Sequence, residues 1–200
     1  MRAAVLVPVK GFDQAKARLA GRLTPRERRA LAGRMAATVV AAGAPLDVYV
    51  VCDDDEVAAW SAAHGAIPLL RPGLGLNGAV ASGVAALADR GIDVVIVAHS
   101  DLPLATDLAS LASWPGVTLV PDRRDDGTNV AVVPAASGFR FAYGAASFRR
   151  HAIETHRLGL SLRVVRQPEL GWDVDVPDDL DHPRLKGIVP SLPTSPANHP

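Results

Sequence analysis

Cysteine, lysine, net charge and long apolar runs are all scarce in this sequence, and most of these shortages exclude a class of protein. Cys52 is the only cysteine among 200 residues, so the chain forms no internal disulfide and no thiolate metal cluster, and Cys52 is expected in the core. Acidic and basic residues number 21 each, which argues against a nucleic-acid-binding surface, because such a surface carries a basic excess. No apolar run approaches the roughly 18 residues of a membrane-spanning helix. We therefore expect a cytoplasmic protein that binds neither nucleic acid nor membrane.

The few lysines are placed unevenly. Lys10, Lys16 and Lys186 are the only lysines among 21 basic residues, and two of them lie just after the first apolar run, residues 3–7, which predicts a buried strand. Ammonium groups on flexible stems bind phosphates as mobile point charges, whereas the guanidinium of arginine is a planar fork. Lys10 and Lys16 therefore indicate a phosphate-binding loop at the end of this strand. The alternative is that both are solvated loop residues.

Strands and helices alternate along the first two thirds of the chain. We predict strands at residues 3–7, 46–52, 66–70, 92–98 and 117–121, and helices at residues 24–42, 56–64, 78–90 and 107–113. The first of these helices has a capping box, formed by Thr24 and Glu27, with Pro25 between them. This alternation predicts an α/β fold with a mostly parallel sheet and helices on both faces.

The pattern becomes irregular after residue 121. We expect short strands at 130–133 and 162–166, an extended segment at 139–143 and a helix at 145–156, which together indicate a mixed sheet. We assign residues 1–186 to a single domain. The remaining residues, 187–200, contain four prolines and are expected to be a disordered tail.

Acidic residues provide a candidate metal site. Ligands of parallel α/β sheets bind beyond the carboxyl ends of the strands, and Asp101 follows the strand at 92–98. Its carboxylate can bind a hard cation such as Mg²⁺ together with substrate phosphates. Asp173 and Asp175 alternate on one face of an extended segment, so one or both can complete the site. The alternatives are a turn or N-cap role for Asp101 and a solvated turn at Asp173 and Asp175, followed by the helix-start acids Asp178, Asp179 and Asp181.

Residues 73–78 match the pattern GxGxxG literally. A dinucleotide-binding loop of this pattern should follow the first strand, whereas this one follows the third. We therefore expect the glycines, Gly75 among them, to let the backbone approach a nucleotide, with Asn77 capping the next helix or contacting a base. A nicotinamide-dependent oxidoreductase built on this loop is the alternative.

A second anion-binding region is expected nearer the C-terminus. Gly127 and Thr128 offer backbone N–H groups, and Thr128 also offers a hydroxyl. A helix opening at Gly144 to Ser147 offers free N–H groups for a phosphate or carboxylate, although Ser147 could instead bond locally at the helix start. The six histidines show no zinc-ligand spacing, and each is expected at the surface or in a turn.

Six motifs together resemble the guanylyltransferases of coenzyme F420 biosynthesis, whose members act on 2-phospho-L-lactate or phosphoenolpyruvate. The motifs are VPVKGFDQAKARL at residues 7–19, GLNGAV at 75–80, SDLPL at 100–104, DGTN at 126–129, YGAASFRRH at 143–151 and WDVDVPDDL at 172–180. The resemblance spans residues 1–181 and implies a single-domain nucleotidyltransferase fold that is GT-A-like and Rossmann-like. The fit is looser at His99 and Ser100 and at residues 123–125.

The resemblance also implies a reaction and a set of site residues. GMP would pass from GTP to phosphoenolpyruvate, giving enolpyruvyl-diphospho-5'-guanosine and pyrophosphate, and the arginine-rich, lysine-poor composition is typical of an actinobacterial source, which favours this acceptor. Lys10, Lys16 and Asp101 would be catalytic. The remaining implied contacts are Pro8, Lys10, Lys16, Gly75 and Asn77 to the nucleotide, Thr128, Gly144 and Ser147 to phosphoenolpyruvate, and Asp101 with Asp173 or Asp175 to Mg²⁺.

The sequence leaves three questions open. The acceptor could instead be 2-phospho-L-lactate or 3-phosphoglycerate, because these acids share a phosphate and a carboxylate with phosphoenolpyruvate. A non-catalytic nucleotide-binding protein is an alternative of another class. The oligomeric state is not determined, a homodimer included, and the resemblance implies that the product passes to the next transferase of the F420 pathway.

Overall fold

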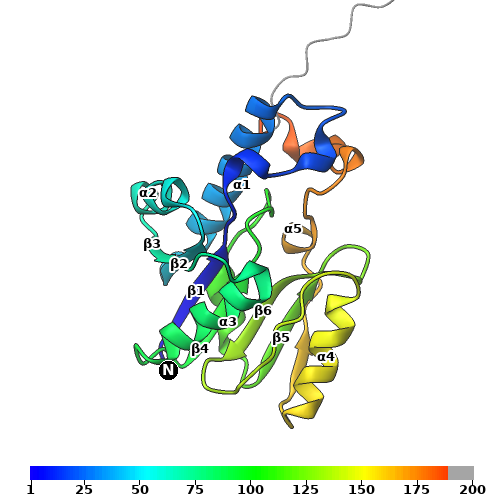
Figure 1. Ribbon diagram of the computed structural model, residues 1–200. Coiled ribbons are helices and arrows are strands. Elements are labelled where there is room, and N and C mark those ends of the chain that lie inside the picture. The colour runs from blue at the N-terminus through cyan, green and yellow to red at the C-terminus, as the bar shows by residue number, and fades with distance from the viewer. Residues whose placement is uncertain (189–200) are drawn as a thin grey trace, which may run out of the picture.

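The apolar runs of the sequence form the strands of one sheet in the computed structural model, which describes residues 1–188 (Figure 1). Seven strands lie in the order β3-β2-β1-β4-β6-β5-β7. Their bounds are Ala3–Pro8 for β1, Asp47–Cys52 for β2, Ile67–Leu70 for β3, Val94–Ala98 for β4, Val117–Pro121 for β5, Thr128–Pro134 for β6 and Leu162–Val164 for β7. Strands β1 and β4 are buried on both faces, as expected for central strands of such a sheet.

The direction of β6 determines which residues meet at the functional edge of the sheet. Strands β1, β2, β3 and β4 run parallel, β5 and β7 run parallel to each other, and β6 is antiparallel to both β4 and β5. The start of β6 at Thr128 therefore lies at the same edge as the carboxyl ends of β1 and β4. The N–H of His99 donates to the carbonyl of Asn129 at 3.0 Å across this edge. The predicted mostly parallel mixed sheet is confirmed.

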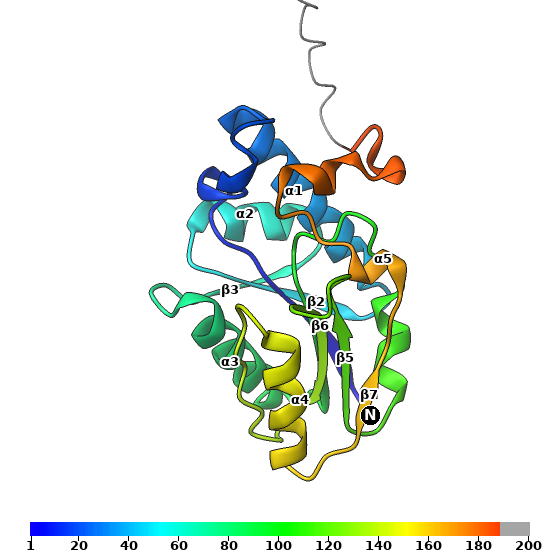
Figure 2. The same cartoon turned by 90° about the vertical axis from the view of Figure 1, so that its right-hand side faces the viewer.

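Helices cover both faces of the sheet. The α-helices are α1 (Pro25–Ala42), α2 (Asp55–Ala63), α3 (Gly75–Ala88), α4 (Ser147–Arg157) and the short α5 (Pro168–Gly171). Buried residues of α1, α2, α5 and η3 (Leu108–Ser113) join one hydrophobic cluster, whereas α3 and α4 pack on the opposite face. Figure 2 shows α3 and α4 on one side of the sheet and α5 on the other.

The alternation of side chains along β1 produces these two layers. Val5 and Val7 face α1, while Leu6 faces α3. Helix α3 lies so close to the sheet that a Cβ atom on Gly83 would be 2.8 Å from Cδ2 of Leu6. A larger residue at this position would force the buried Leu6 side chain to move, so glycine allows the close packing of α3 on β1.

A separate apolar cluster joins residues 19–35 to residues 174–185 above the functional edge. Leu19, in the short helix η2 (Ala17–Leu19), packs with residues of α1 and of the segment 172–188 that contains η4 (Pro177–Asp181) and η5 (Pro183–Leu185). In Figures 1 and 2 these N-terminal and C-terminal segments lie side by side at the top of the molecule. The cluster places the Lys16 loop next to Asp173 and Asp175. Its members are Leu19, Leu23, Leu31, Met35, Leu104, Val174, Leu180 and Leu185.

Several local predictions can now be compared with the structure. The capping box is confirmed, because Thr24 N–H donates to Glu27 at 2.8 Å and Thr24 Oγ1 accepts from the Glu27 N–H. Helix α3 begins at Gly75, so the predicted start near Gly78 is wrong. The predicted helix at 107–113 is a 3₁₀ helix. Residues 189–200, most of the predicted tail, lie outside the described residues, so the assignment of one domain and a tail stays a prediction.

No helix within residues 1–188 is both long enough and apolar enough to cross a membrane.

Candidate functional site

Three cavities lie along the edge where the parallel strands end. The lysine cavity, about 340 Å³, is lined by residues that include Pro8, Lys10, Lys16, His99 and Asp101. The acidic cavity, about 490 Å³, is lined by residues that include His99, Asp101, Thr128, Asn129, Gly144, Ser147, Asp173 and Asp175. A small third cavity, about 50 Å³, is lined by Pro8, Lys10, Gly75 and neighbouring residues. Because His99 and Asp101 line both larger cavities, those two meet at the end of β4.

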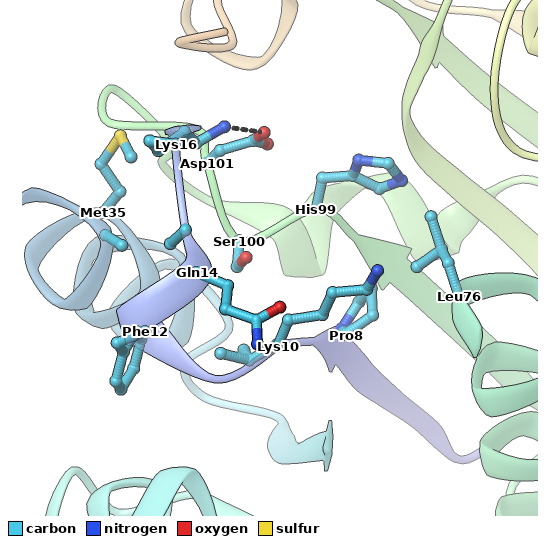
Figure 3. A pocket seen from close by; sticks show the side chains of 13 residues that line it. Pro8, Lys10, Phe12, Gln14, Lys16, Met35, Leu76, His99, Ser100 and Asp101 are labelled. Atoms are coloured by element: carbon cyan, nitrogen blue, oxygen red, sulfur yellow. Dashed lines mark hydrogen bonds and ion pairs between the residues drawn. The ribbon is translucent and has the colours of Figure 1, made fainter. Parts of the chain in front are cut away.

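Lys16 lies between two of the predicted metal ligands. Its ammonium donates to Asp101 Oδ2 at 2.6 Å and to Asp175 Oδ1 at 3.0 Å, and Figure 3 shows it reaching the Asp101 carboxylate. Burial alone would lower the pKa of Lys16, but the charges of Asp101 and Asp175 outweigh burial and raise it. Burial likewise tends to raise the pKa of Asp101, and the ammonium of Lys16 reverses this and lowers it. Both groups therefore remain charged around neutral pH.

The backbone at Lys16 is strained. Its φ of 55° lies in the left-handed region, which costs a residue with a side chain about 1–2 kcal/mol. Apolar packing of Leu19 in the cluster above the edge stabilises this conformation. The cost indicates that the loop is held in a shape that directs the ammonium into the site.

Asp173 is one of the five aspartates that line the acidic cavity, with Asp101, Asp122, Asp126 and Asp175. Burial first, and then the like charges of Asp101 and Asp175, raise the pKa of Asp173 to about 6. Within the described residues, Asp101 Oδ1 and Asp173 Oδ1 are buried oxygens without a hydrogen-bond partner. A buried carboxylate oxygen without a hydrogen bond is costly, and Arg123 Nη1 is too far from Asp173 Oδ1, at 3.9 Å, to donate one. A bound cation would stabilise both oxygens.

The carboxylates of the acidic cavity fit a divalent cation. Asp101, Asp173 and Asp175 carry three negative charges when ionised, which Lys16 and the more distant Arg123, itself shared with Asp179, offset only in part. Nowhere in residues 1–188 do three His, Cys, Asp or Glu side chains form a ready-made metal site. Mg²⁺ does not need one, because it binds through one or two carboxylates and completes its shell with water and substrate phosphates.

Asp179 holds the backbone at Asp175 and Val176 in place, a role that its predicted position as a helix-start acid did not reveal. Its carboxylate is fully buried, pairs with Arg123 and accepts from the N–H groups of Asp175 at 2.6 Å and Val176 at 2.8 Å. Burial tends to raise the pKa of Asp179, but these backbone donors and Arg123 lower it. Asp179 therefore remains ionised and fixes the backbone that carries Asp175.

The residues predicted to bind the acceptor do lie together. Thr128, Gly144 and Ser147 line the acidic cavity, and Thr128 Oγ1 lies 3.5 Å from Ser147 Oγ. Gly144 has a φ of +111°, a conformation that residues with side chains rarely adopt. The chain turns there into α4, so that the turn and the first hydroxyl of the helix face the same cavity.

Part of the predicted anion pocket is wrong. The N–H groups of Ala146, Ser147 and Phe148 already donate to Asp126 Oδ1, the Gly144 carbonyl and the Asp126 carbonyl. The N–H of Gly127 donates to Asp122 Oδ2 at 2.9 Å. Side-chain and backbone acceptors in the loop thus satisfy these donors. The N–H groups of Gly144 and Ala145 and the two hydroxyls are the polar groups of this part of the cavity that remain for a ligand.

The residues predicted to contact the nucleotide line two different cavities. Pro8 and Lys10 line both the lysine cavity and the small cavity, and Gly75 lines the small cavity. Asn77 lies inside α3, not at its cap, and its Oδ1 accepts from the N–H of Tyr143 at 2.7 Å. The predicted cap is therefore wrong, and Asn77 connects α3 to the segment before Gly144.

Two histidines contradict the expectation that each lies at the surface or in a turn without a site role. His99 is largely buried at the junction of the two large cavities, with its Nε2 unpaired among the described residues, and its ring lies 4.7 Å from that of Tyr143. His151 is fully buried in α4 and contacts Thr128. The spacing of four residues from Ser147 to His151, one helical turn, was the available signal, because it puts both on one face of the helix.

Comparison with known proteins shows the family to which this chain belongs. Residues 3–188 match the family model described as Guanylyl transferase CofC like. The chain is 39% identical over 199 residues to a phosphoenolpyruvate guanylyltransferase of Sphaerobacter thermophilus, covering 95% of each chain. It is 33% identical to a 2-phospho-L-lactate guanylyltransferase of Methanothermobacter thermautotrophicus, covering 94% of this chain and 86% of the relative.

Solved structures show the same fold at low identity. A candidate nucleotide-diphospho-sugar transferase from Desulfovibrio desulfuricans G20 matches with a TM-score of 0.71 at 19% identity, over 88% of this chain and 84% of that one. A nucleotidyl transferase from Methanothermobacter thermautotrophicus matches with a TM-score of 0.61 at 15% identity, over 89% and 94%. The predicted nucleotidyltransferase fold is confirmed.

Proposed function

Because this chain belongs to the Guanylyl transferase CofC like family, we propose that it transfers GMP from GTP to phosphoenolpyruvate in coenzyme F420 biosynthesis. As a member of the family it is a nucleotidyltransferase. Relatives at 39% and 37% identity are named phosphoenolpyruvate guanylyltransferases, which supports this acceptor. 2-Phospho-L-lactate and 3-phosphoglycerate are the alternatives.

The observation that carries the proposal is the junction of the two large cavities at His99 and Asp101. The lysine cavity, with Lys10 and Lys16, suits the triphosphate of GTP. The acidic cavity, with Thr128, Gly144 and Ser147, suits an acid that carries a phosphate and a carboxylate. The α-phosphorus of GTP would then lie at the junction, within reach of an acceptor from the second cavity.

In the proposed reaction, an oxygen of the acceptor phosphate attacks the α-phosphorus of GTP in line. The bond between that phosphorus and the oxygen bridging to the β-phosphate breaks, and pyrophosphate leaves. Both reactants are anions, so catalysis consists of positioning and charge neutralisation. Lys10 and Lys16 neutralise the triphosphate and the departing pyrophosphate, while Pro8 and Gly75 let the nucleotide approach the backbone.

Asp101 and Asp173, with Asp175 beside them, would hold Mg²⁺. When bound there, the ion supplies positive charge between the carboxylates and the phosphates. Lys16 keeps Asp101 and Asp175 together, and Asp179 keeps Asp175 in place. We further propose that the enzyme works in the cytoplasm and that its product passes to the next transferase of the pathway.

Pyrophosphate release from GTP tests the proposal. It should be measured with Mg²⁺ and each of the three acceptors, beside the same assays with ATP. We expect release that depends on both Mg²⁺ and acceptor, fastest with GTP and phosphoenolpyruvate. Release with none of the three acids would refute guanylyl transfer, and faster release with another acid would reassign the acceptor.

A further inference from the structure

His151 is a fully buried polar residue that the proposed mechanism does not use. It lies on α4 one turn after Ser147, and its ring packs against Phe139 and Tyr143 at centroid distances of 5.6 and 4.9 Å. Both of its ring nitrogens have partners. Nε2 accepts from the N–H of Ala142 at 2.9 Å, and Nδ1 lies 3.0 Å from Thr128 Oγ1.

The backbone partner determines where the imidazole carries its proton. A backbone N–H can only donate, so Nε2 must present a lone pair to Ala142. The proton of the neutral ring is then on Nδ1, and Nδ1–H donates to Thr128 Oγ1. Burial, followed by the charges of His99 and Arg150, lowers the pKa of His151 to about 4, which agrees with a neutral ring.

This assignment constrains the hydroxyl of Thr128. The hydroxyl oxygen accepts a hydrogen bond from His151 Nδ1–H, so the hydroxyl hydrogen is not used in the contact with His151. The hydroxyl of Ser147 donates to the same oxygen at 3.5 Å, at the outer limit of a hydrogen bond, so each of the two lone pairs of Thr128 Oγ1 faces a donor. Thr128 and Ser147 both line the acidic cavity, so the hydrogen of Thr128 is available to an acceptor atom in that cavity.

We propose that His151 is a positioning residue that makes Thr128 an obligatory hydrogen-bond donor to an anionic oxygen of the acceptor substrate. The inference rests on the proposed function, in which that substrate binds at Thr128, Gly144 and Ser147. An obligatory donor recognises an anionic oxygen and disfavours a hydroxyl or amide donor in the same position. His151 thereby contributes to the choice of a phosphorylated acid.

The same imidazole also fixes the backbone next to Gly144. Besides the bond from Ala142 N–H to His151, Arg150 donates to the carbonyl of Ala142 at 2.8 and 3.0 Å and to that of Tyr143 at 3.3 Å. Two consecutive residues of α4 therefore hold the segment that leads into Gly144. Neither contacts Lys10 or Lys16, so the effect of His151 should be confined to the acceptor.

Two amide variants separate the two hydrogen bonds. The amide of asparagine reaches the position of Nδ1, so His151→Asn can still donate to Thr128. The amide of glutamine reaches the position of Nε2, so His151→Gln can accept from Ala142 but loses the donor to Thr128. Steady-state kinetics with Mg²⁺, GTP and phosphoenolpyruvate should be compared for the wild type and both variants, with thermal melting as the check on folding.

We expect His151→Gln to raise the KM for phosphoenolpyruvate about tenfold, the effect of losing one hydrogen bond to a charged group, and His151→Asn to raise it much less. The KM for GTP should stay within about twofold of the wild-type value in both, since a two-fold change is well below the effect of one hydrogen bond. The double variant Thr128→Val with His151→Gln should be no worse than Thr128→Val alone, because the two residues act through one hydroxyl. Three results would overturn the inference. They are an equal rise in the KM for phosphoenolpyruvate in His151→Asn and His151→Gln, additive losses in the double variant, and a rise in the KM for GTP as large as the rise for phosphoenolpyruvate.

The design also distinguishes the inference from the function on which it rests. Normal turnover of the wild type together with the wrong pattern in the variants overturns only the role of His151. No turnover of the wild type with any of the three acids overturns both. If His151→Gln does not fold, Thr128→Ser and Thr128→Val replace it: the serine variant should keep the KM for phosphoenolpyruvate and the valine variant should raise it, and the same value in both would refute the donor role.

Discussion

Lys16 is the residue on which the charge balance of the site depends. Lys16→Met should lower kcat/KM by about 10²–10³, the usual effect of removing one preorganised group that stabilises developing charge. It should also lower the free energy of unfolding by about 1–3 kcal/mol, because Asp101 and Asp175 lose their shared counter-charge in a partly buried site.

The matched control for Lys16 is Lys186, an exposed lysine away from the cavities. Lys186→Met should leave turnover and unfolding by denaturant unchanged within error. Steady-state kinetics at pH 7.5 compare the two variants directly. Equal activity of Lys16→Met and Lys186→Met would mean that Lys16 has no role in the reaction.

Replacing Asp173 should raise stability while it lowers activity, whereas replacing Lys16 should lower both. The pKa of Asp173 in the folded protein is about 6, above its ordinary value of 3.8, so the folded state binds a proton more readily than the unfolded state does. The stability that this proton contributes is present below pH 4 and is lost as the pH rises to about 6.

Asp173→Asn should therefore be more stable than the wild type at pH 8, by about 1–3 kcal/mol, when no metal or nucleotide is added. Urea unfolding at pH 8 and pH 4 measures this difference, which should shrink at pH 4, and the variant should have lost its Mg²⁺-dependent activity. A variant that is less stable than the wild type at pH 8 would show that the Asp173 carboxylate is well accommodated without a cation.

At the scale of an element, the turn into α4 presents the acceptor pocket. Gly144→Ala should cost about 1–3 kcal/mol of stability, because a φ of +111° strains any residue with a Cβ atom. It should also raise the KM for phosphoenolpyruvate while leaving the KM for GTP unchanged, since the turn lines only the acidic cavity.

Gly159 at the other end of α4 provides the control. Its φ is +65°, and a Cβ atom there would meet nothing within 4 Å. Gly159→Ala should cost about 1 kcal/mol of stability and leave both KM values unchanged. Kinetics and thermal melting of the pair separate strain from ligand contact, and a parallel rise of the acceptor KM in both variants would contradict a specific role for the turn.

Local patterns in the sequence were sufficient for some elements and not for others. The apolar runs of β1 and β4 and the capping box of α1 depend on neighbouring residues, and all three were predicted. The free N–H groups predicted at the start of α4 were partly wrong, because those of Ala146 and Phe148 bond to Asp126, about 20 residues away in the chain. Asp179 and His151 were missed for the same reason, since their importance comes from Arg123 and Thr128.

At the scale of the whole molecule, we expect the apolar cluster that joins residues 19–35 to residues 174–185 to hold the site geometry. Leu185 is 1% exposed and packs with Leu31 and Met35 of α1. Leu185→Ala should cost about 2–5 kcal/mol by leaving a cavity, and it should raise the Mg²⁺ concentration needed for half-maximal turnover because the segment that carries Asp175 loosens.

The control for this variant is Leu70 at the sheet edge. Leu70 is 42% exposed on β3, far from the apolar cluster, so Leu70→Ala should change stability by less than about 1 kcal/mol and leave the Mg²⁺ dependence unchanged. Denaturant unfolding and Mg²⁺ titrations of turnover provide both readouts. An unchanged Mg²⁺ dependence in a folded Leu185→Ala protein would show that the cluster does not position the metal site.

The arrangement of the whole site was only partly predictable. Strand ends indicated where Lys10, Lys16 and Asp101 would gather, because parallel strands place their carboxyl ends together. Nothing in the order of residues indicated that Lys16 would bond to Asp101 and Asp175, or that β6 would run antiparallel and bring Thr128 to the same edge. Those facts follow from pairing between segments distant in the chain.

Phosphorus NMR of the reaction mixture tests guanylyl transfer most directly. With GTP, phosphoenolpyruvate and Mg²⁺, we predict a new diphosphate in which the α-phosphorus of GTP is coupled to the acceptor phosphorus, formed together with an equal amount of pyrophosphate. The new signal should be absent when phosphoenolpyruvate or Mg²⁺ is omitted. Unchanged GTP, or pyrophosphate accompanied only by free GMP, would contradict the account.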